Sequence, residues 1–117
     1  MKKPMLVFLA LALTTASALP EPKTPVSIRY LGADGQQHRA VYSRVLTVKT
    51  LRMYGADVRE VQRQLVGIWP AAKRLKIDGY YGPLTAAAVK SYQLGNGLTP
   101  NGVVNFTTWD QLFSIGE

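Results

Sequence analysis

Acidic side chains are the residues of this sequence that could cleave a glycan. Hydrolysis of a glycosidic bond requires two carboxylates that flank the bond. The chain has seven acidic residues: Glu21, Asp34, Asp57, Glu60, Asp78, Asp110 and Glu117. Asp57 and Glu60 have the spacing of a helix-capping box, in which the Asp carboxylate accepts an amide of the first turn and Glu60 reaches back. Asp34 and Asp78 occupy turn sequences, and the first and last acids lie near the chain ends, so we expect no catalytic carboxylate pair.

Histidine and cysteine chemistry is also restricted. A serine triad or a zinc site would require histidine, and His38 is the only one. It follows a predicted turn without partner ligands, which favours an exposed strand residue. The absence of cysteine excludes disulfides, a thiol nucleophile, cysteine-ligated zinc and a lipid-bearing cysteine. We therefore predict a protein that is not an enzyme and has no metal or other cofactor.

Two similar turn sequences occur in the C-terminal half. Asp78–Thr85 and Asn101–Thr108 align without gaps at an offset of 23 residues. In each, Asp or Asn can bond to its own nearby backbone and precedes a Gly that can adopt positive φ. Two apolar or aromatic residues follow, which we expect to point inward. Gly82 and Asn105 occupy equivalent positions, and both residue types tolerate the left-handed region. We predict that the two segments fold alike and that each begins a helix.

Apolar spacing predicts three helices that these turns connect. From Asp57 on, apolar residues recur three and four positions apart, which is typical of one buried helical face; they are Val58, Val61, Leu65 and Ile68. Arg59, Glu60, Arg63 and Gln64 are expected to face elsewhere. The second helix opens at Pro83, buries Ala88, Val89 and Tyr92, and stops at Gly95 and Gly97. The third buries Phe106, Trp109, Leu112 and Phe113. The predicted fold is mainly α.

The N-terminal third has a different pattern. Residues 26–31 and 37–48 are rich in β-formers and flank an Asp-Gly turn signal, so a short β-hairpin is predicted to precede the helices. We interpret this arm, residues 26–50, as an extension of the core rather than a separate binding site. Residues 19–25 contain three prolines and are predicted to be a linker. The domain organisation is therefore a signal at 1–18, a linker, an arm and a helical domain at 51–113.

The first eighteen residues have the features of an export signal. Lys2 and Lys3 precede an apolar run, and the small residues Ala16-Ser17-Ala18 fit a signal-peptidase site. The run is shorter than the roughly 20 residues that span a bilayer, which disfavours a membrane anchor. We predict cleavage after Ala18 and a secreted or periplasmic protein with no membrane span after cleavage.

Net charge indicates the class of partner. The 117-residue chain has 14 basic and 7 acidic residues. Loss of the two signal lysines leaves 12 against 7, a net charge of +5 on 99 residues. Anionic wall polymers, carboxylates and lipid headgroups are the candidate partners. Because the basic residues are spread along the chain, nucleic acid is not expected.

A set of motifs gives the helical region a resemblance to a known family. In order, these are Gly55-Ala56-Asp57-Val58, Val61-Gln62, Leu65, Asp78-Gly79-Tyr80-Tyr81-Gly82, Thr85, Ala88-Val89, Tyr92-Gln93, Gly97-Leu98, Asn101-Gly102-Val103, Thr108-Trp109 and Leu112. Residues 51–113 thus resemble the peptidoglycan-binding-domain-like family, a three-helix module found beside cell-wall amidases, transglycosylases and peptidases. The resemblance implies adhesion to bacterial peptidoglycan without turnover, at the cell wall.

Candidate ligand contacts follow from the doubled turn. The turn amides could bind a carboxylate of the peptidoglycan stem peptide, and a tyrosine ring could contact sugar or peptide. The predicted site comprises Asp78, Gly79, Tyr80, Tyr81, Gly82, Thr85, Asn101 and Gly102. The same residues also suit turn formation and capping alone, with at least one of Tyr80 and Tyr81 in the core. Two other functions remain open: a protein-interaction or regulatory subunit that docks on a wall hydrolase, and nonspecific anion binding.

Overall fold

The computed structural model describes residues 18–114. All of the predicted export signal except Ala18 therefore lies outside the described residues, as does Glu117. The elements in chain order are β1 (Val26–Leu31), β2 (Gln37–Tyr42), α2 (Ala56–Ile68), the short 3-10 helix η1 (Pro70–Ala72), α3 (Pro83–Gly95) and α4 (Phe106–Phe113). Within residues 18–114, no helix is long and apolar enough to cross a membrane.

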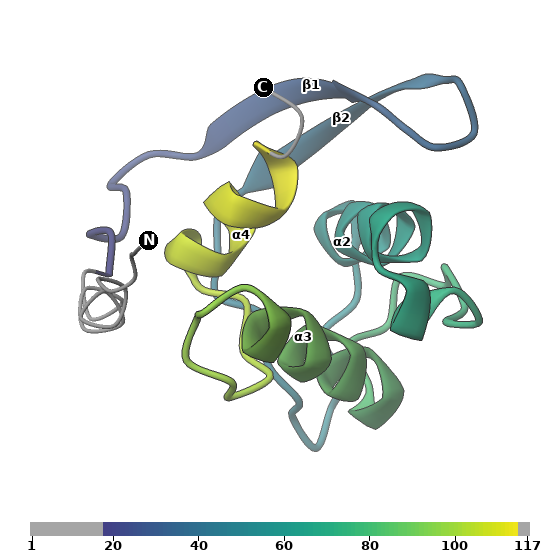
Figure 1. Ribbon diagram of the computed structural model, residues 1–117. Coiled ribbons are helices and arrows are strands. Elements are labelled where there is room, and N and C mark those ends of the chain that lie inside the picture. The colour runs from purple at the N-terminus through teal and green to yellow at the C-terminus, as the bar shows by residue number, and fades with distance from the viewer. Residues whose placement is uncertain (1–17, 115–117) are drawn as a thin grey trace, which may run out of the picture.

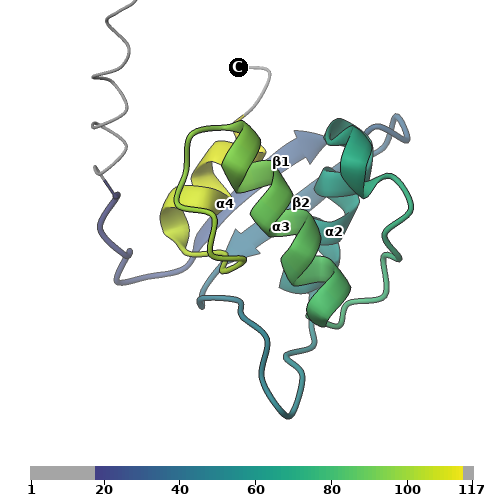
Figure 2. The same ribbon diagram turned by 60° about the horizontal axis from the view of Figure 1, so that its bottom comes forward.

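The three α-helices form a small bundle with the hairpin on one side. α2 packs against both α3 and α4, and β2 packs against α2 and α4. The hairpin consequently lies on the opposite side of α2 and α4 from α3 (Figure 1). In the turned view, α3 lies in front of the two strands (Figure 2). The prediction of three helices preceded by a hairpin is confirmed, and the strands contribute a second structural layer.

The core contains the apolar faces that the spacing predicted. On α2, Val58, Val61 and Leu65 have no exposed surface. Each such side chain stabilises the fold by about 1.5–3 kcal/mol through burial. The other buried apolar residues of the helices are Val89, Tyr92, Trp109, Leu112 and Phe113. Tyr30, Ala40 and Tyr42 add the hairpin to the same cluster, as expected of an arm that extends the core.

The second strand is shorter than the pattern predicted. β2 pairs with β1 from Gln37, opposite Leu31, to Tyr42, opposite Val26. Beyond it, Leu46 leaves the hairpin and forms an isolated antiparallel bridge with Val104. The Leu46 amide donates to the Val104 carbonyl at 3.0 Å, and the Val104 amide donates to the Leu46 carbonyl at 2.9 Å. The β-forming residues after Tyr42 therefore tie the chain to a turn between helices instead of lengthening the hairpin.

The predicted capping box is wrong. α2 begins at Ala56 after Gly55, and no side chain caps it. The Asp57 carboxylate does accept an amide of the first turn, that of Val58 at 2.9 Å, but from within the helix, and it also pairs with Arg44, whose Nε and Nη2 donate at 2.7 and 3.0 Å. Glu60 accepts a 2.6 Å hydrogen bond from the Tyr30 hydroxyl of β1. Asp57 therefore keeps a local bond and adds a long-range partner, whereas Glu60 bonds to the hairpin rather than back to the start of the helix.

The predicted linker lies against α4. The Leu19 amide donates to the Thr107 hydroxyl at 2.7 Å. The Glu21 carboxylate accepts the Phe106 amide at 3.0 Å and also accepts the Tyr42 hydroxyl. Because Phe106 is the first residue of α4, Glu21 places a negative charge at the positive end of that helix.

Candidate functional site: a basic pocket beside the first turn

The first turn, residues 78–85, is organised around a buried glutamine of α2. The Gln62 side-chain nitrogen donates to Asp78 Oδ1 at 3.1 Å, to the Tyr80 carbonyl at 3.0 Å and to Thr85 Oγ1 at 3.0 Å. Gln62 Oε1 accepts the amide of Gly79 at 2.8 Å. Gly79 has φ of 83°, the left-handed conformation that glycine adopts without strain. One side chain therefore satisfies four polar groups of the turn.

The second turn, residues 101–108, repeats this arrangement with a glutamine of α3. The Gln93 nitrogen donates to Asn101 Oδ1 at 3.2 Å, to the Val103 carbonyl at 2.9 Å and to Thr108 Oγ1 at 3.0 Å. Its oxygen accepts the amide of Gly102, whose φ is 73°. The prediction that both segments fold alike is confirmed, and the glutamine forms the same four bonds in each.

The roles predicted for Gly82 and Asn105 are wrong. Gly82 has φ of −105° and Asn105 of −92°, so neither is left-handed, and both are helix N-cap residues. Asn105 Oδ1 accepts the Thr108 amide at 3.0 Å, which is ordinary N-capping. Gly82 leaves room for Arg52, because a Cβ there would lie 3.0–3.4 Å from three guanidinium atoms and would require that side chain to shift slightly.

Only one of the two apolar residues in each turn points inward, not both as predicted. Tyr81 and Val104 are fully buried, whereas Tyr80 is 49% exposed and Val103 is half-buried. The Tyr81 hydroxyl donates to the Gly102 carbonyl at 2.6 Å, and burial raises the pKa of Tyr81 above its usual value. Tyr81 therefore links the two turns through the core, and Tyr80 is the ring left at the surface.

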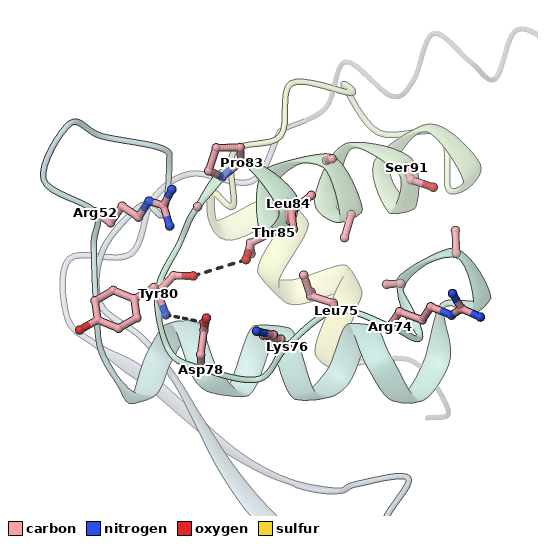
Figure 3. Close-up of a pocket in the computed structure, with 15 residues that line it drawn as sticks. Arg52, Arg74, Leu75, Lys76, Asp78, Tyr80, Pro83, Leu84, Thr85 and Ser91 are labelled. Atoms are coloured by element: carbon pink, nitrogen blue, oxygen red, sulfur yellow. Dashed lines mark hydrogen bonds between the residues drawn. The ribbon is translucent and has the colours of Figure 1, made fainter.

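A pocket of about 650 Å³ lies between α3 and the segment that runs from η1 to the first turn (Figure 3). This volume is typical of ligand pockets. Its apolar surface comes from both sides and comprises Ala71, Ala72, Leu75, Pro83, Leu84, Ala87 and Ala88. Leu84 is 78% exposed, so it offers apolar surface that the fold itself does not bury.

Three cationic side chains surround this apolar surface. Arg52, Arg74 and Lys76 all line the pocket, and Asp78 is its only acid. Among residues 18–114, none of the three cations forms an ion pair. The Asp78 carboxylate accepts the Tyr80 amide at 3.0 Å, and this bond, together with Gln62, lowers the pKa of Asp78 below its usual value. The pocket therefore has an excess of positive charge and suits an anionic ligand.

The predicted site residues fall into two groups. Four line the pocket: Asp78, Tyr80, Gly82 and Thr85. The other four do not, namely Gly79, Tyr81, Asn101 and Gly102. Gly79 and Gly102 donate to the buried glutamines, and Tyr81 is in the core. The doubled turn thus forms one wall of the pocket with its first copy only.

Sequence reasoning missed the cations of the pocket. Lys73, Arg74 and Lys76 place three positive charges within four positions. The basic residues are spread along the chain as a whole, but this local cluster is a usable signal for the pocket cations. Arg52 had no comparable signal, because only the fold brings it against Gly82.

His38 is less exposed than predicted. Its side chain is 16% exposed, and Nε2 lies 2.9 Å from an Asp34 oxygen. Nδ1 lies 4.0 Å from a Glu60 oxygen. Within residues 18–114, no group of three or more metal-ligating side chains could hold an ion. His38 therefore links the hairpin loop to α2.

Comparison with known proteins identifies the helical region. A protein-family model described as "Putative peptidoglycan binding domain" matches residues 54–112. An N-acetylmuramoyl-L-alanine amidase, CwlL, of Bacillus licheniformis is 41% identical over 77 residues, which cover 62% of this chain and 21% of that protein. The zinc D-Ala-D-Ala carboxypeptidase of Streptomyces albus G is 33% identical over 63 residues, 54% of this chain and 25% of that protein. The chain thus spans about a quarter or less of these relatives. No solved structure matches.

Proposed function

The chain belongs to the peptidoglycan-binding domain family, and on this premise we propose that the pocket beside the first turn binds the stem peptide of bacterial peptidoglycan. The excess positive charge of the pocket carries this proposal. Arg52, Arg74 and Lys76 lie around an apolar surface, with Asp78 as the only acid. A stem peptide carries several carboxylates on a short chain with apolar methyl and methylene groups, so its chemistry complements this lining.

The cations have complementary capacities for such a ligand. Guanidinium groups bind carboxylates through two parallel hydrogen bonds, whereas the lysine ammonium acts as a point charge. Arg74 and Lys76 border the pocket on the η1 side, and Arg52 borders it near Gly82 (Figure 3). Carboxylates at separate positions of one peptide could therefore be bound together.

We further propose that the protein adheres to peptidoglycan without cleaving it. Asp57, Glu60 and Asp78 are engaged in ion pairs or hydrogen bonds of the fold. Glu21 is bonded to the start of α4. These contacts support structural roles for four of the seven acids. The predicted export signal supports a secreted or periplasmic protein associated with the cell wall.

Sedimentation with purified sacculi tests the function. We expect the full chain to be retained at physiological salt. Replacing both Arg74 and Lys76 by Glu should lower retention at least about tenfold, because two attractions become repulsions. Replacing Arg29 and Arg39 by Glu makes the same change in net charge on the exposed hairpin and is the matched control.

Two outcomes would overturn the proposal. Absence of retention of the unaltered chain contradicts peptidoglycan binding, and a stoichiometric envelope protein that co-purifies instead would favour docking on a hydrolase. Equal losses in the pocket variant and the hairpin control would show nonspecific anion binding, which also weakens steeply with salt.

A further inference from the structure

Two exposed tyrosines stand side by side at the edge of the pocket. Tyr54 and Tyr80 are 53% and 49% exposed, and their ring centroids are 4.6 Å apart with an interplanar angle of 46°. An antiparallel bridge joins the two residues, and the Tyr81 amide donates to the Met53 carbonyl at 2.9 Å. The backbone therefore holds the rings in place without burying them.

The turn itself does not require this aromatic surface. Val103 occupies the position of Tyr80 in the second turn, where the same glutamine bonds form around a half-buried aliphatic side chain. Within residues 18–114, Tyr54 and Tyr80 are the only aromatic residues among the exposed large apolar ones. Exposure of two rings leaves apolar surface in water, which is typical of a recognition site.

Polar groups beside the rings suit a carbohydrate. Arg59 Nη2 donates to the Tyr54 hydroxyl at 3.0 Å, and the guanidinium carbon lies 5.8 Å from the centre of that ring. A guanidinium group has five N–H donors, and sugar hydroxyl and acetamide oxygens can accept such bonds. Aromatic faces carry negative potential and attract the polarised C–H groups of a pyranose ring.

We propose that the Tyr54–Tyr80 pair binds the amino sugar to which the stem peptide is attached. This inference rests on the proposed function, because it places the peptide of the same ligand in the pocket. Tyr80 belongs to both surfaces: it lines the pocket, and its ring contacts Tyr54. A sugar on the ring pair would therefore adjoin a peptide that extends toward Arg74 and Lys76. The ligand class becomes a muramyl peptide rather than a free peptide.

Calorimetry on the full chain with two probes, muramyl-tetrapeptide and the same tetrapeptide without sugar, tests the inference. Tyr54→Ala should weaken muramyl-tetrapeptide binding about 5-fold, the effect of one lost aromatic contact, and leave the free tetrapeptide unchanged, because Tyr54 does not line the pocket. Tyr80→Val should weaken binding of muramyl-tetrapeptide more than binding of the free tetrapeptide. Tyr54→Trp should retain the affinity. Valine at position 80 copies the second turn, so the fold should tolerate it. Leu31→Ala, at an exposed residue of β1, is the control.

The outcomes separate this inference from the function on which it rests. If the unaltered chain binds muramyl-tetrapeptide and both tyrosine variants bind it equally well, the sugar site is overturned and the pocket stands. If Tyr54→Ala loses affinity equally for the free tetrapeptide, its ring contacts peptide and the sugar site is again overturned. If the unaltered chain binds neither probe, the proposed function itself fails.

Discussion

The two turns of this protein share the bonds to a buried glutamine and have different surroundings. The first turn borders the pocket, where Arg52 lies against it and the Tyr80 ring remains exposed. The second turn is flanked instead by the N-terminal segment, because Glu21 binds the Phe106 amide, whereas each turn has one backbone bridge to a preceding loop. The shared signature therefore encodes how a turn folds, and the neighbours of each copy determine whether a ligand can reach it.

The starts of the two helices show the same division. α3 opens with Pro83, which has no N–H to satisfy, so no side chain needs to cover that position. α4 begins with Phe106, whose N–H donates to the Glu21 carboxylate. The Asn105 side chain accepts the Thr108 amide. No side chain therefore caps the N-terminus of α3 beside the pocket, whereas Glu21 and Asn105 bond to the N-terminus of α4.

The largest expected effect is on stability and tests whether the turns are structurally equivalent. Gln62→Met and Gln93→Met keep the side-chain volume and remove the bonds to the turn. Each leaves the buried amide of Gly79 or Gly102 without its partner and removes the amide donor shared by three acceptors of the turn, so we expect a loss of about 2–4 kcal/mol in the free energy of unfolding for either variant. Urea denaturation measures this. Gln111→Met, at an exposed position of α4, should change stability by less than about 0.5 kcal/mol.

The same pair of variants tests whether the turns differ in function. While both remain folded, Gln62→Met should also weaken muropeptide binding, because Gln62 orients Asp78 and Tyr80 at the pocket wall. Gln93→Met should leave binding unchanged. Equal losses of affinity would contradict the assignment of the site to the first turn alone.

A smaller effect is expected from removing the closure of the second turn. Glu21→Ala deletes the acceptor of the Phe106 amide and of the Tyr42 hydroxyl. Because the carboxylate is exposed to solvent, we expect the free energy of unfolding to fall by only about 1 kcal/mol. Binding at the pocket should not change. Urea denaturation and calorimetry check both statements, and a loss of affinity without a loss of stability would show that the N-terminal segment takes part in the site.

Local sequence signals were sufficient for most of the fold. The spacing of Val58, Val61 and Leu65 predicted which face of α2 is buried, because helical periodicity alone determines which residues share a face. The repeat of Asp78-Gly79 in Asn101-Gly102 predicted two equivalent turns for the same local reason. The hidden role of Gln62 could not be predicted from polarity, because only the fold shows that its polar atoms satisfy a turn 16 residues away.

The site was less predictable because it depends on residues distant in sequence. Arg52 reaches the pocket through a loop that packs against Gly82, and no local pattern indicates that contact. The ion pair of Asp57 with Arg44, thirteen positions earlier, was likewise not indicated by the capping pattern. Local patterns thus predicted elements and turns, whereas long-range pairs determined which side chains face the ligand.

The smallest expected effects come from exchanging the residues that open the two turns. Asp78→Asn places in the first turn the asparagine side chain that opens the second. In the second turn, Asn101 Oδ1 already accepts the equivalent bonds. At neutral pH, stability should change by less than about 0.5 kcal/mol. The pKa of Asp78 is lowered in the folded protein, so its contribution is complete above the unfolded pKa and is lost as pH falls through the folded pKa. The variant should therefore lose less stability than the unaltered chain between about pH 4 and pH 2.

Asn101→Asp is the reciprocal exchange and should add acid sensitivity to the second turn, since the new carboxylate would accept the Val103 amide. Affinity should respond to the first exchange only. Asp78→Asn removes the one negative charge that lines the pocket and should strengthen binding of an anionic stem peptide about 2- to 3-fold. Asn101→Asp lies outside the pocket and should not alter it. Calorimetry at neutral pH measures both changes, and equal responses would mean that the two turns share the ligand.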